Sequence, residues 1–133
     1  MKYLLDTNAC INAIHQTLPK FNARFLLVPQ QNKVICSVVR YELFYGAYKS
    51  QRRATSLPMI EGFLAAYSIL DFDEKAARIC GELRTDLERK GLPIGPYDLQ
   101  IAAIALNHKL TLVTHNTREF SRVPNLTLED WEI

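Results

Sequence analysis

Cysteine and long apolar runs are scarce in this sequence, and each scarcity excludes a class of protein. The three cysteines, Cys10, Cys36 and Cys80, form no C-x-x-C pair and lie at no ligand spacing from a histidine. A disulfide scaffold or a zinc site is therefore not expected, and the thiols are interpreted as reduced core residues. No run approaches the ~18 apolar residues of a transmembrane helix, and the run before Asp6 is too short for a signal peptide. We expect one cytoplasmic domain covering residues 1–133.

Acidic residues are scarce in the first half of the chain. Residues 1–66 hold eight Lys/Arg and three acids, a net charge of +5, whereas residues 67–133 hold eight Lys/Arg and eleven acids, a net charge of −3. A basic half is compatible with a polyanionic partner but does not require one. The only acids of the basic half are Asp6, Glu42 and Glu61, so their positions are informative.

Short apolar, β-branched runs alternate with longer helical segments. Strands are predicted at residues 3–5, 34–36, 69–70, 110–114 and 126–128. Helices are predicted from residue 7 or 8 to 14 and at 21–30, 37–50, 57–66, 73–90 and 96–107, with Thr7 or Asn8, Ser37 and Asp73 as N-caps and Pro96 as a first helical residue. The alternation predicts an α/β fold of three layers, in which helices flank a central, mostly parallel sheet of four to five short strands.

Two carboxylates of the basic half stand at unusual places. Asp6 follows directly on a buried strand, and ligands gather at the carboxyl ends of parallel strands, although an aspartate that merely caps a helix is equally common there. Glu42 shares a helical face with Val38, Val39 and Tyr45, which predicts a carboxylate along the apolar side of its helix. The alternative is a glutamate at the edge of that stripe, paired with an arginine.

Asp98 repeats this pattern in the acidic half. Its same-face neighbours at helical spacing are Ile101, Ala102 and Ala105, on a helix with almost no polar face. An acid in the first helical turn is also favoured by the helix dipole alone. Together, Asp6, Glu42 and Asp98 would be costly to bury unpaired, and no basic residue shares their helical faces. If the three converge, oxygen ligands without His or Cys suit Mg²⁺ or Mn²⁺, and such a site favours metal-assisted phosphodiester hydrolysis by an activated water.

Four segments resemble the motifs of PIN domains, in the order and at the chain length usual for that family. They are Leu4-Leu5-Asp6-Thr7-Asn8, the segment from Ser37 to Ala47 that contains Glu42-Leu43, the segment from Ile94 to Ala103 that contains Asp98, and Leu112-Val113-Thr114-His115-Asn116-Thr117-Arg118-Glu119-Phe120. Within the family, the chain is most similar to the VapC-type toxins of VapBC toxin–antitoxin systems. The resemblance covers nearly the whole chain and implies a PIN-like fold.

The resemblance also implies an activity, a cofactor and partners. VapC-type proteins are Mg²⁺- or Mn²⁺-dependent endoribonucleases that commonly cut structured RNA such as transfer RNA, and they are usually homodimers held inactive by a VapB-type antitoxin. By match of motif, Asp6 and Asp98 are the expected direct metal ligands, and Glu42 completes the shell or orients the attacking water. Many relatives carry a fourth acid where this chain has Asn116. Glu119 could supply the missing carboxylate, or the Asn116 amide could contact water or phosphate.

Further residues around this expected site allow two interpretations each. Tyr41, Tyr45 and Tyr97 flank the predicted ligands and could stack on RNA bases, or they are core residues with one end in water. Nearby cations could bind phosphate or be plain solvated charges, namely Arg40, Lys49, Arg52 and Arg53. His15, His108 and His115 look isolated and are interpreted as structural or surface residues.

Competing functions are weaker. A catalytically weak or inactive PIN-fold module that binds RNA or protein would fit the loss of an acid at Asn116, but the acidic trio is complete. An aspartyl phosphatase is disfavoured because the second aspartate after the first strand is absent in Asp6-Thr7-Asn8. A serine or cysteine hydrolase is disfavoured because no G-x-S-x-G elbow is present.

Overall fold

Five parallel strands form a central sheet in the order β3-β2-β1-β4-β5, in a computed structural model that describes residues 2–133. The strands are β1 (Tyr3–Leu5), β2 (Lys33–Cys36), β3 (Ile69–Leu70), β4 (Thr111–Val113) and β5 (Leu128–Glu129). The predicted α/β class and parallel sheet are confirmed. All-parallel sheets need both faces covered, and the strands of this sheet read as short apolar runs for that reason.

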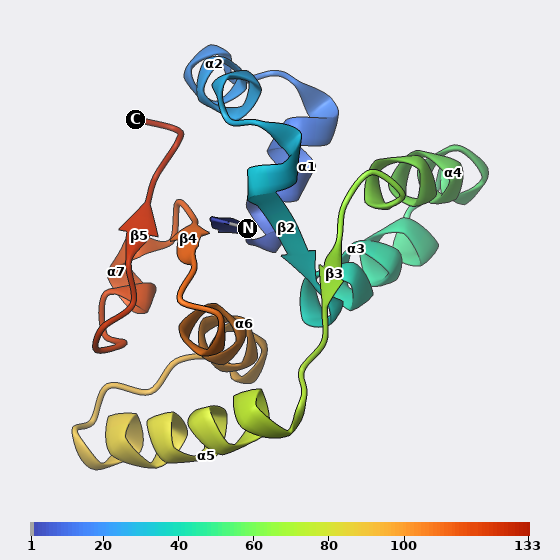
Figure 1. Ribbon diagram of the computed structural model, residues 1–133. Coiled ribbons are helices and arrows are strands. Elements are labelled where there is room, and N and C mark those ends of the chain that lie inside the picture. The colour runs from blue at the N-terminus through green and yellow to red at the C-terminus, as the bar shows by residue number, and fades with distance from the viewer. Residues whose placement is uncertain (1) are drawn as a thin grey trace.

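Helices connect successive strands and cover the sheet. They are α1 (Thr7–His15), α2 (Pro19–Leu27), α3 (Ser37–Lys49), α4 (Arg53–Leu64), α5 (Glu74–Arg89), α6 (Pro96–Asn107) and α7 (Thr117–Phe120), with a single 3-10 turn, η1 (Gln30–Asn32), before β2. Figure 1 shows α1 and α2 on one side of the sheet and α5 and α6 on the other, while α3 and α4 project together at one end. Nowhere in residues 2–133 is there a helix both long and apolar enough to cross a membrane.

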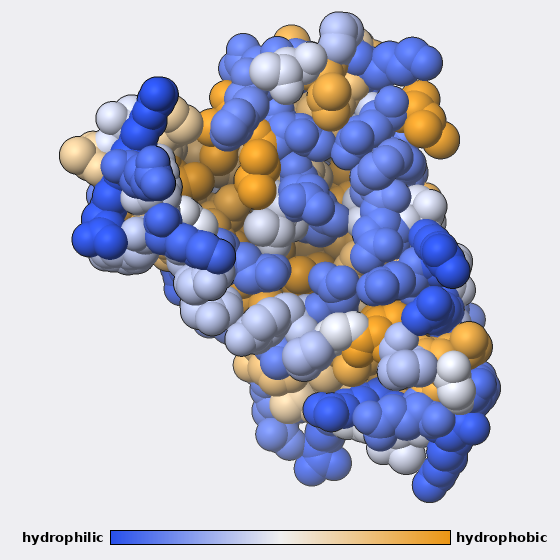
Figure 2. All heavy atoms as spheres, turned by 180° about the vertical axis from the view of Figure 1, so that it is seen from behind, coloured by the Kyte–Doolittle hydropathy of each residue, from blue (hydrophilic) through white to orange (hydrophobic). Residues whose placement is uncertain are grey.

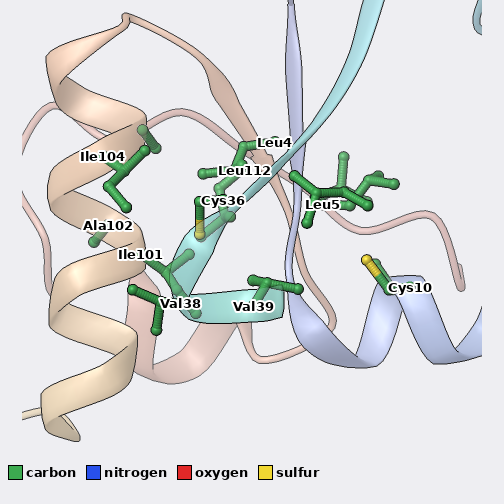
Figure 3. Close-up of a cluster of buried hydrophobic side chains, with 14 of the residues drawn as sticks. Leu4, Leu5, Cys10, Cys36, Val38, Val39, Ile101, Ala102, Ile104 and Leu112 are labelled. Carbon is green, nitrogen blue, oxygen red and sulfur yellow. The ribbon is translucent and has the colours of Figure 1, made fainter. Parts of the chain in front are cut away.

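The core lies between the sheet and helices α3 and α6. Leu4, Cys36 and Leu112 come from adjacent strands, and Figure 3 shows them near Val39 of α3 and Ile101 of α6. All five are at most 1% exposed, so burial of their side chains is a main source of stability. Helix α6 is buried from Ile101 to Ala105, as its unbroken apolar sequence predicts.

Several predicted helix ends are wrong. Asp6, rather than Thr7 or Asn8, is the N-cap of α1, because its carboxylate accepts the backbone N–H of Ala9 at 2.8 Å. Ser37 is the first residue of α3, and its hydroxyl accepts the backbone N–H of Phe72 instead of capping its own helix. The cap at Asp73, the start at Pro96 and both limits of β1 are confirmed.

Several other element boundaries also differ from the predicted ones. Helix α2 begins at Pro19 and ends at Leu27, earlier at both ends than predicted. Helix α4 begins at Arg53, four residues before the predicted start, and carries Pro58 in its interior, where proline usually ends a helix. Strand β5 is shifted by two residues at its start, to Leu128.

The sheet topology places the carboxyl ends of β1 and β4 next to each other. The chain runs outward from β1 through β2 to β3 and then returns to the other side of β1 for β4, so β1 lies at the point where the direction of winding reverses. A backbone hydrogen bond from Asp6 to the carbonyl of Val113 joins the ends of β1 and β4. Crevices in open α/β sheets form at this position, outside the carboxyl ends of the strands.

Candidate metal centre and its surroundings

A small acidic cavity of about 150 Å³ lies at the carboxyl ends of β1 and β4. Its lining residues come from four elements or their flanking turns: Asp6, Thr7, Asn8, Glu42, Asp98, Asn116 and Phe120. We call this cavity the acidic pocket. Four of the five residues that the sequence singled out for the reaction line it, and the fifth, Glu119, approaches it through Asn116, whose amide lies 3.4 Å from the Glu119 carboxylate.

Asp6 is the most deeply buried acid of the pocket, with 6% of its surface exposed. Burial raises the pKa of Asp6 from 3.8 to about 6, and the negative charges of Glu132 and Glu42 act in the same direction. Hydrogen bonds from the Thr114 hydroxyl and the Ala9 backbone N–H partly oppose the rise. The Thr114 hydroxyl thus contacts the carboxylate cluster directly.

Asp98 occupies the first turn of α6 and is half-buried. Burial also raises the pKa of Asp98 from 3.8 to about 6, and the charges of Glu42, Asp6 and Glu119 add to the rise. Asp98 therefore feels the charge of Asp6, and both carboxylates feel the charge of Glu42. Carboxylates that raise a neighbour's pKa and have no cationic partner are typical of a site that binds a cation.

Glu42 stands at the edge of α3 rather than on its buried face. Val38 and Val39 of the predicted stripe are buried, but Tyr45 is 57% exposed, so the prediction that Glu42 points along an apolar face is wrong. The Glu42 carboxylate is half-buried and accepts the hydroxyl proton of Thr7 at 2.7 Å. This hydrogen bond from α1 fixes the carboxylate against the pocket.

The turn after β4 carries Asn116 and Glu119. The Thr114 hydroxyl, itself in contact with Asp6, accepts the backbone N–H of Asn116 at 3.0 Å. Asn116 precedes the short helix α7, and Glu119 lies within it. Because the charge of Glu119 raises the pKa of Asp98, Glu119 lies close enough to act on the pocket.

The donor set of the pocket fits a hard divalent cation. In residues 2–133 no Lys, Arg or His forms an ion pair with Asp6, Glu42 or Asp98. Oxygen donors without His or Cys favour Mg²⁺ or Mn²⁺ over zinc. The ligand atoms of these three residues are not all within 4.8 Å of one another. Such spacing suits an ion that keeps several of its waters rather than one enclosed by protein ligands.

A second cluster of potential ligands lies beyond Thr114. His115, Asp130 and Glu132 bring one ligand atom each within 4.8 Å of the others, and they are the sole trio of this spacing in the part of the chain that the structure describes. His115 is therefore not isolated, because its Nδ1 lies 2.9 Å from an Asp130 oxygen, and this contact raises its pKa. No local sequence pattern indicates this cluster, because Asp130 and Glu132 follow β5 and reach His115 only through the fold.

The tyrosines near the pocket are surface residues. Tyr41, Tyr45 and Tyr97 are 50%, 57% and 44% exposed, so their interpretation as core residues is wrong. The hydroxyls of Tyr41 and Tyr97 lie 3.5 Å apart, and this contact is the main cause that raises the pKa of Tyr41. The four predicted cations are exposed as well. Lys49 lies over the Tyr45 ring, 5.7 Å from its centroid, and Arg53 over the Tyr48 ring at 5.8 Å.

An apolar groove of about 300 Å³ lies on the other side of α3. Helices α1, α3 and α4 line it with mostly aliphatic side chains: Ile11, Ile14, Leu43, Ala47, Met59 and Ile60. We call it the aliphatic groove. Figure 2 shows hydrophobic atoms in the hollow beside the lobe that contains α4, at the left of that view. Glu42 lines both this groove and the acidic pocket.

Comparison with known proteins agrees with this architecture. The model of the family described as PIN domain matches residues 3–126. The chain is 45% identical over 131 residues to the tRNA(fMet)-specific endonuclease VapC of Shigella flexneri, with 98% of both chains covered. It is 43% identical over 133 residues to the ribonuclease VapC2 of Rickettsia felis, with 99% of both covered.

Solved structures give the same result. The toxin chain in the DNA-bound VapBC complex of Salmonella typhimurium superposes with a TM-score of 0.92 at 42% identity, over 98% of each chain. The four motifs, the five-stranded parallel sheet and these matches over almost the full length agree with one another. The chain therefore belongs to the PIN-domain family and, within it, to the VapC group.

Proposed function

We propose that this protein is the toxin of a type II toxin–antitoxin system, a single PIN-like nuclease domain that hydrolyses RNA phosphodiester bonds as a Mg²⁺-dependent endoribonuclease, with Mn²⁺ as a substitute. The observation that carries the proposal is the acidic pocket. Asp6, Glu42 and Asp98 come from three different elements, line one cavity, and have no ion-pair partner within residues 2–133. Such an arrangement is costly to fold unless it serves a cation.

Each acid has a distinct proposed role. Asp6 and Asp98 are the direct ligands, since both line the pocket and have a pKa raised by burial and by the charge of Glu42. When bound, the divalent cation would polarise a phosphoryl oxygen and make a coordinated water a better nucleophile. Glu42, held by the Thr7 hydroxyl, orients the attacking water or completes the shell.

The turn after β4 completes the proposed site. Asn116 lines the pocket and offers an amide to water or to a phosphate oxygen. Glu119 contacts Asn116 and brings the carboxylate that many relatives carry at the asparagine position. We infer that the two residues together perform the task of that fourth acid.

The substrate class follows from the relatives. The Shigella flexneri relative is named a tRNA(fMet)-specific endonuclease and the Rickettsia felis relative a ribonuclease. Transfer RNA is therefore the first substrate to test. Because an RNA target and an antitoxin partner are both found in the bacterial cytoplasm, we infer that the protein acts there.

A VapB-type antitoxin is the proposed partner, and the aliphatic groove is its proposed seat. The solved relatives include VapBC complexes from Salmonella typhimurium and Rickettsia felis. An aliphatic concavity between three helices suits the apolar face of a partner helix. Glu42 lines both cavities, so an antitoxin in the groove would lie next to the catalytic pocket. A homodimer, which the family resemblance implies, stays a prediction.

The decisive experiment compares the wild type with Asp6→Asn and Asp98→Asn on purified transfer RNA and total RNA, with Mg²⁺ or excess EDTA. Asp86→Asn, on an exposed position of α5, is the matched control. We expect one discrete product from the wild type and the control in Mg²⁺, and none in EDTA or from the two pocket variants. Asparagine keeps the cap of α1, so the fold of Asp6→Asn should persist.

An inert wild type that is folded and free of antitoxin would refute the nuclease proposal. The inactive RNA- or protein-binding module would then be the better interpretation. Cleavage that continues in EDTA would instead refute the role of the cation. Circular dichroism of every variant separates either result from misfolding.

A further inference from the structure

The exposed side of α3 carries a row of tyrosines. Tyr41, Tyr45 and Tyr48 recur at offsets of four and three, so they lie on one helical face, and each is 50–57% exposed. A fourth tyrosine, Tyr97 of α6, joins the row at its pocket end, with its ring centroid 5.5 Å from that of Tyr41 and an interplanar angle of 57°. We call Tyr41 and Tyr97 the tyrosine pair.

The tyrosine pair lies near the acidic pocket without lining it, and the charge of Glu42 is among the causes that raise the pKa of Tyr41. Tyr41 immediately precedes Glu42, and Tyr97 immediately precedes Asp98, and both acids line the pocket. The 3.5 Å contact between the two phenol oxygens ties α3 to α6 at this point. The two tyrosines are thus held together next to residues of the acidic pocket, and about half of each residue is open to solvent.

Charge around the row favours a polyanion. Arg40 precedes Tyr41 and is exposed, Lys49 lies over the ring of Tyr45, and Arg53 lies over the ring of Tyr48. The row therefore runs from the acidic pocket toward a basic end of α3. Aromatic faces alternating with cations form the usual platform for single-stranded nucleic acid, on which bases stack while phosphates meet the cations.

We propose that Tyr41 and Tyr97 form a stacking platform for an unpaired RNA base next to the bond that is cut, and that this platform restricts cleavage to single-stranded positions such as loops. The inference rests on the proposed nuclease function. Tyr45 and Lys49 continue the track for the neighbouring nucleotide. An aliphatic protein surface is the poorer occupant, because the row offers phenols and cations rather than aliphatic side chains.

The test uses Tyr41→Leu and Tyr97→Leu, with the phenylalanine variants at both positions as rescue. Leu92→Ala is the control, because that exposed leucine lies outside the tyrosine row and lines neither cavity. On a cleaved RNA, we expect the leucine variants to raise KM about 10-fold with little change in kcat, as loss of one stacked base would. The phenylalanine variants should stay close to wild type, since the ring face carries the effect.

A binding measurement separates this inference from the proposed function. A short single-stranded RNA with 2-aminopurine at its centre is titrated into Asp6→Asn and into the same variant carrying Tyr41→Leu. Quenching of the fluorescence in the first protein and its loss in the second would support stacking whether or not cleavage occurs. Equal quenching, or equal KM for loop and duplex targets in all variants, overturns it.

Oligomeric state provides the remaining control. If the leucine variants change the mass measured by light scattering and leave RNA binding unaltered, the tyrosine pair belongs to a contact between copies of the chain, and the inference is wrong. If the wild type cuts RNA normally but all tyrosine variants match it, the nuclease proposal stands and the platform alone fails.

Discussion

The two faces of α3 carry opposite kinds of apolar surface. On one face, Leu43 and Ala47 line the aliphatic groove with α1 and α4. On the other, Tyr41, Tyr45 and Tyr48 expose about half of their surface beside cations. An aliphatic concavity is suited to a protein helix, whereas phenol rings next to positive charge are suited to nucleic acid. The contrast indicates that one helix can separate regulation from substrate binding.

Glu42 lies between these faces and lines both cavities, and its substitution is expected to have the largest effect. Glu42→Gln removes a carboxylate charge from the pocket but keeps the size of the side chain, so the groove is almost unchanged. We expect RNA cleavage to fall by about 100-fold or more, as for loss of a positioned base or ligand, with antitoxin affinity within about 2-fold. The measurements are single-turnover cleavage and calorimetric titration of the antitoxin. An equal loss of both would mean that pocket and groove act as one site.

Substitution of Asp6 tests whether the ionised carboxylate in the acidic pocket destabilises the metal-free protein. Because the folded-state pKa of about 6 exceeds the ordinary 3.8, the metal-free protein loses stability as the pH rises through this interval. In EDTA near pH 7.5, Asp6→Asn should therefore raise the free energy of unfolding by up to about 3 kcal/mol, and the gain should vanish near pH 3.5.

Urea unfolding in EDTA at several pH values measures this difference, and Asp86→Asn serves as the exposed control. Added Mg²⁺ should narrow the gap, because the ion stabilises only the wild-type pocket. If the difference in free energy of unfolding between Asp6→Asn and the wild type is the same near pH 5 and near pH 7.5, the pKa of Asp6 is not raised in the folded protein.

Substitution of Met59 changes the aliphatic groove without changing the acidic pocket. Its side chain is 48% exposed, so Met59→Glu should leave the fold intact while placing a charge in an apolar surface. We expect antitoxin affinity to weaken about 10-fold and RNA cleavage to be unaffected, because a desolvated charge opposes burial of the partner. Leu92→Glu, at an exposed leucine that lines neither cavity, is the control. Normal antitoxin binding by Met59→Glu would exclude the groove as its seat.

The sequence predicts the strands and the acidic trio better than it predicts the surface. Strands such as Tyr3–Leu5 are buried runs with few alternatives, and Asp6 and Asp98 stand where buried elements begin or end. By contrast, the helical stripe around Glu42 was misassigned, because valine and tyrosine look alike in an apolar pattern while only tertiary packing decides which is covered. Tyr45 is exposed for that reason.

Long-range contacts explain the other errors. Ser37 has the sequence of a helix cap, but its hydroxyl is taken by the Phe72 backbone from a different segment. His115 looked isolated, yet Asp130 reaches it from fifteen residues away. The local sequence around Ser37 and His115 does not indicate either of these partners. Family resemblance, rather than periodicity, linked Asn116 and Glu119 to the pocket, and their mutual contact appears only in three dimensions.

Substitution of Gly46 has the smallest expected effect, and it tests the stability of the α3 backbone. It is an exposed glycine inside α3, on the groove side, and a Cβ added there would meet no atom within 4 Å. Gly46→Ala should therefore stabilise the protein by about 0.5–1 kcal/mol, because alanine loses less backbone entropy in a helix. Cleavage should be unchanged, since a methyl group alters neither the Glu42 carboxylate nor the tyrosine row. Thermal unfolding and the cleavage assay on the same preparation check this, whereas antitoxin affinity is no control here because Gly46 itself lines the groove. If the stabilised helix cuts RNA more slowly at the same KM, then α3 must flex during the reaction, and the two faces are coupled through the backbone between them.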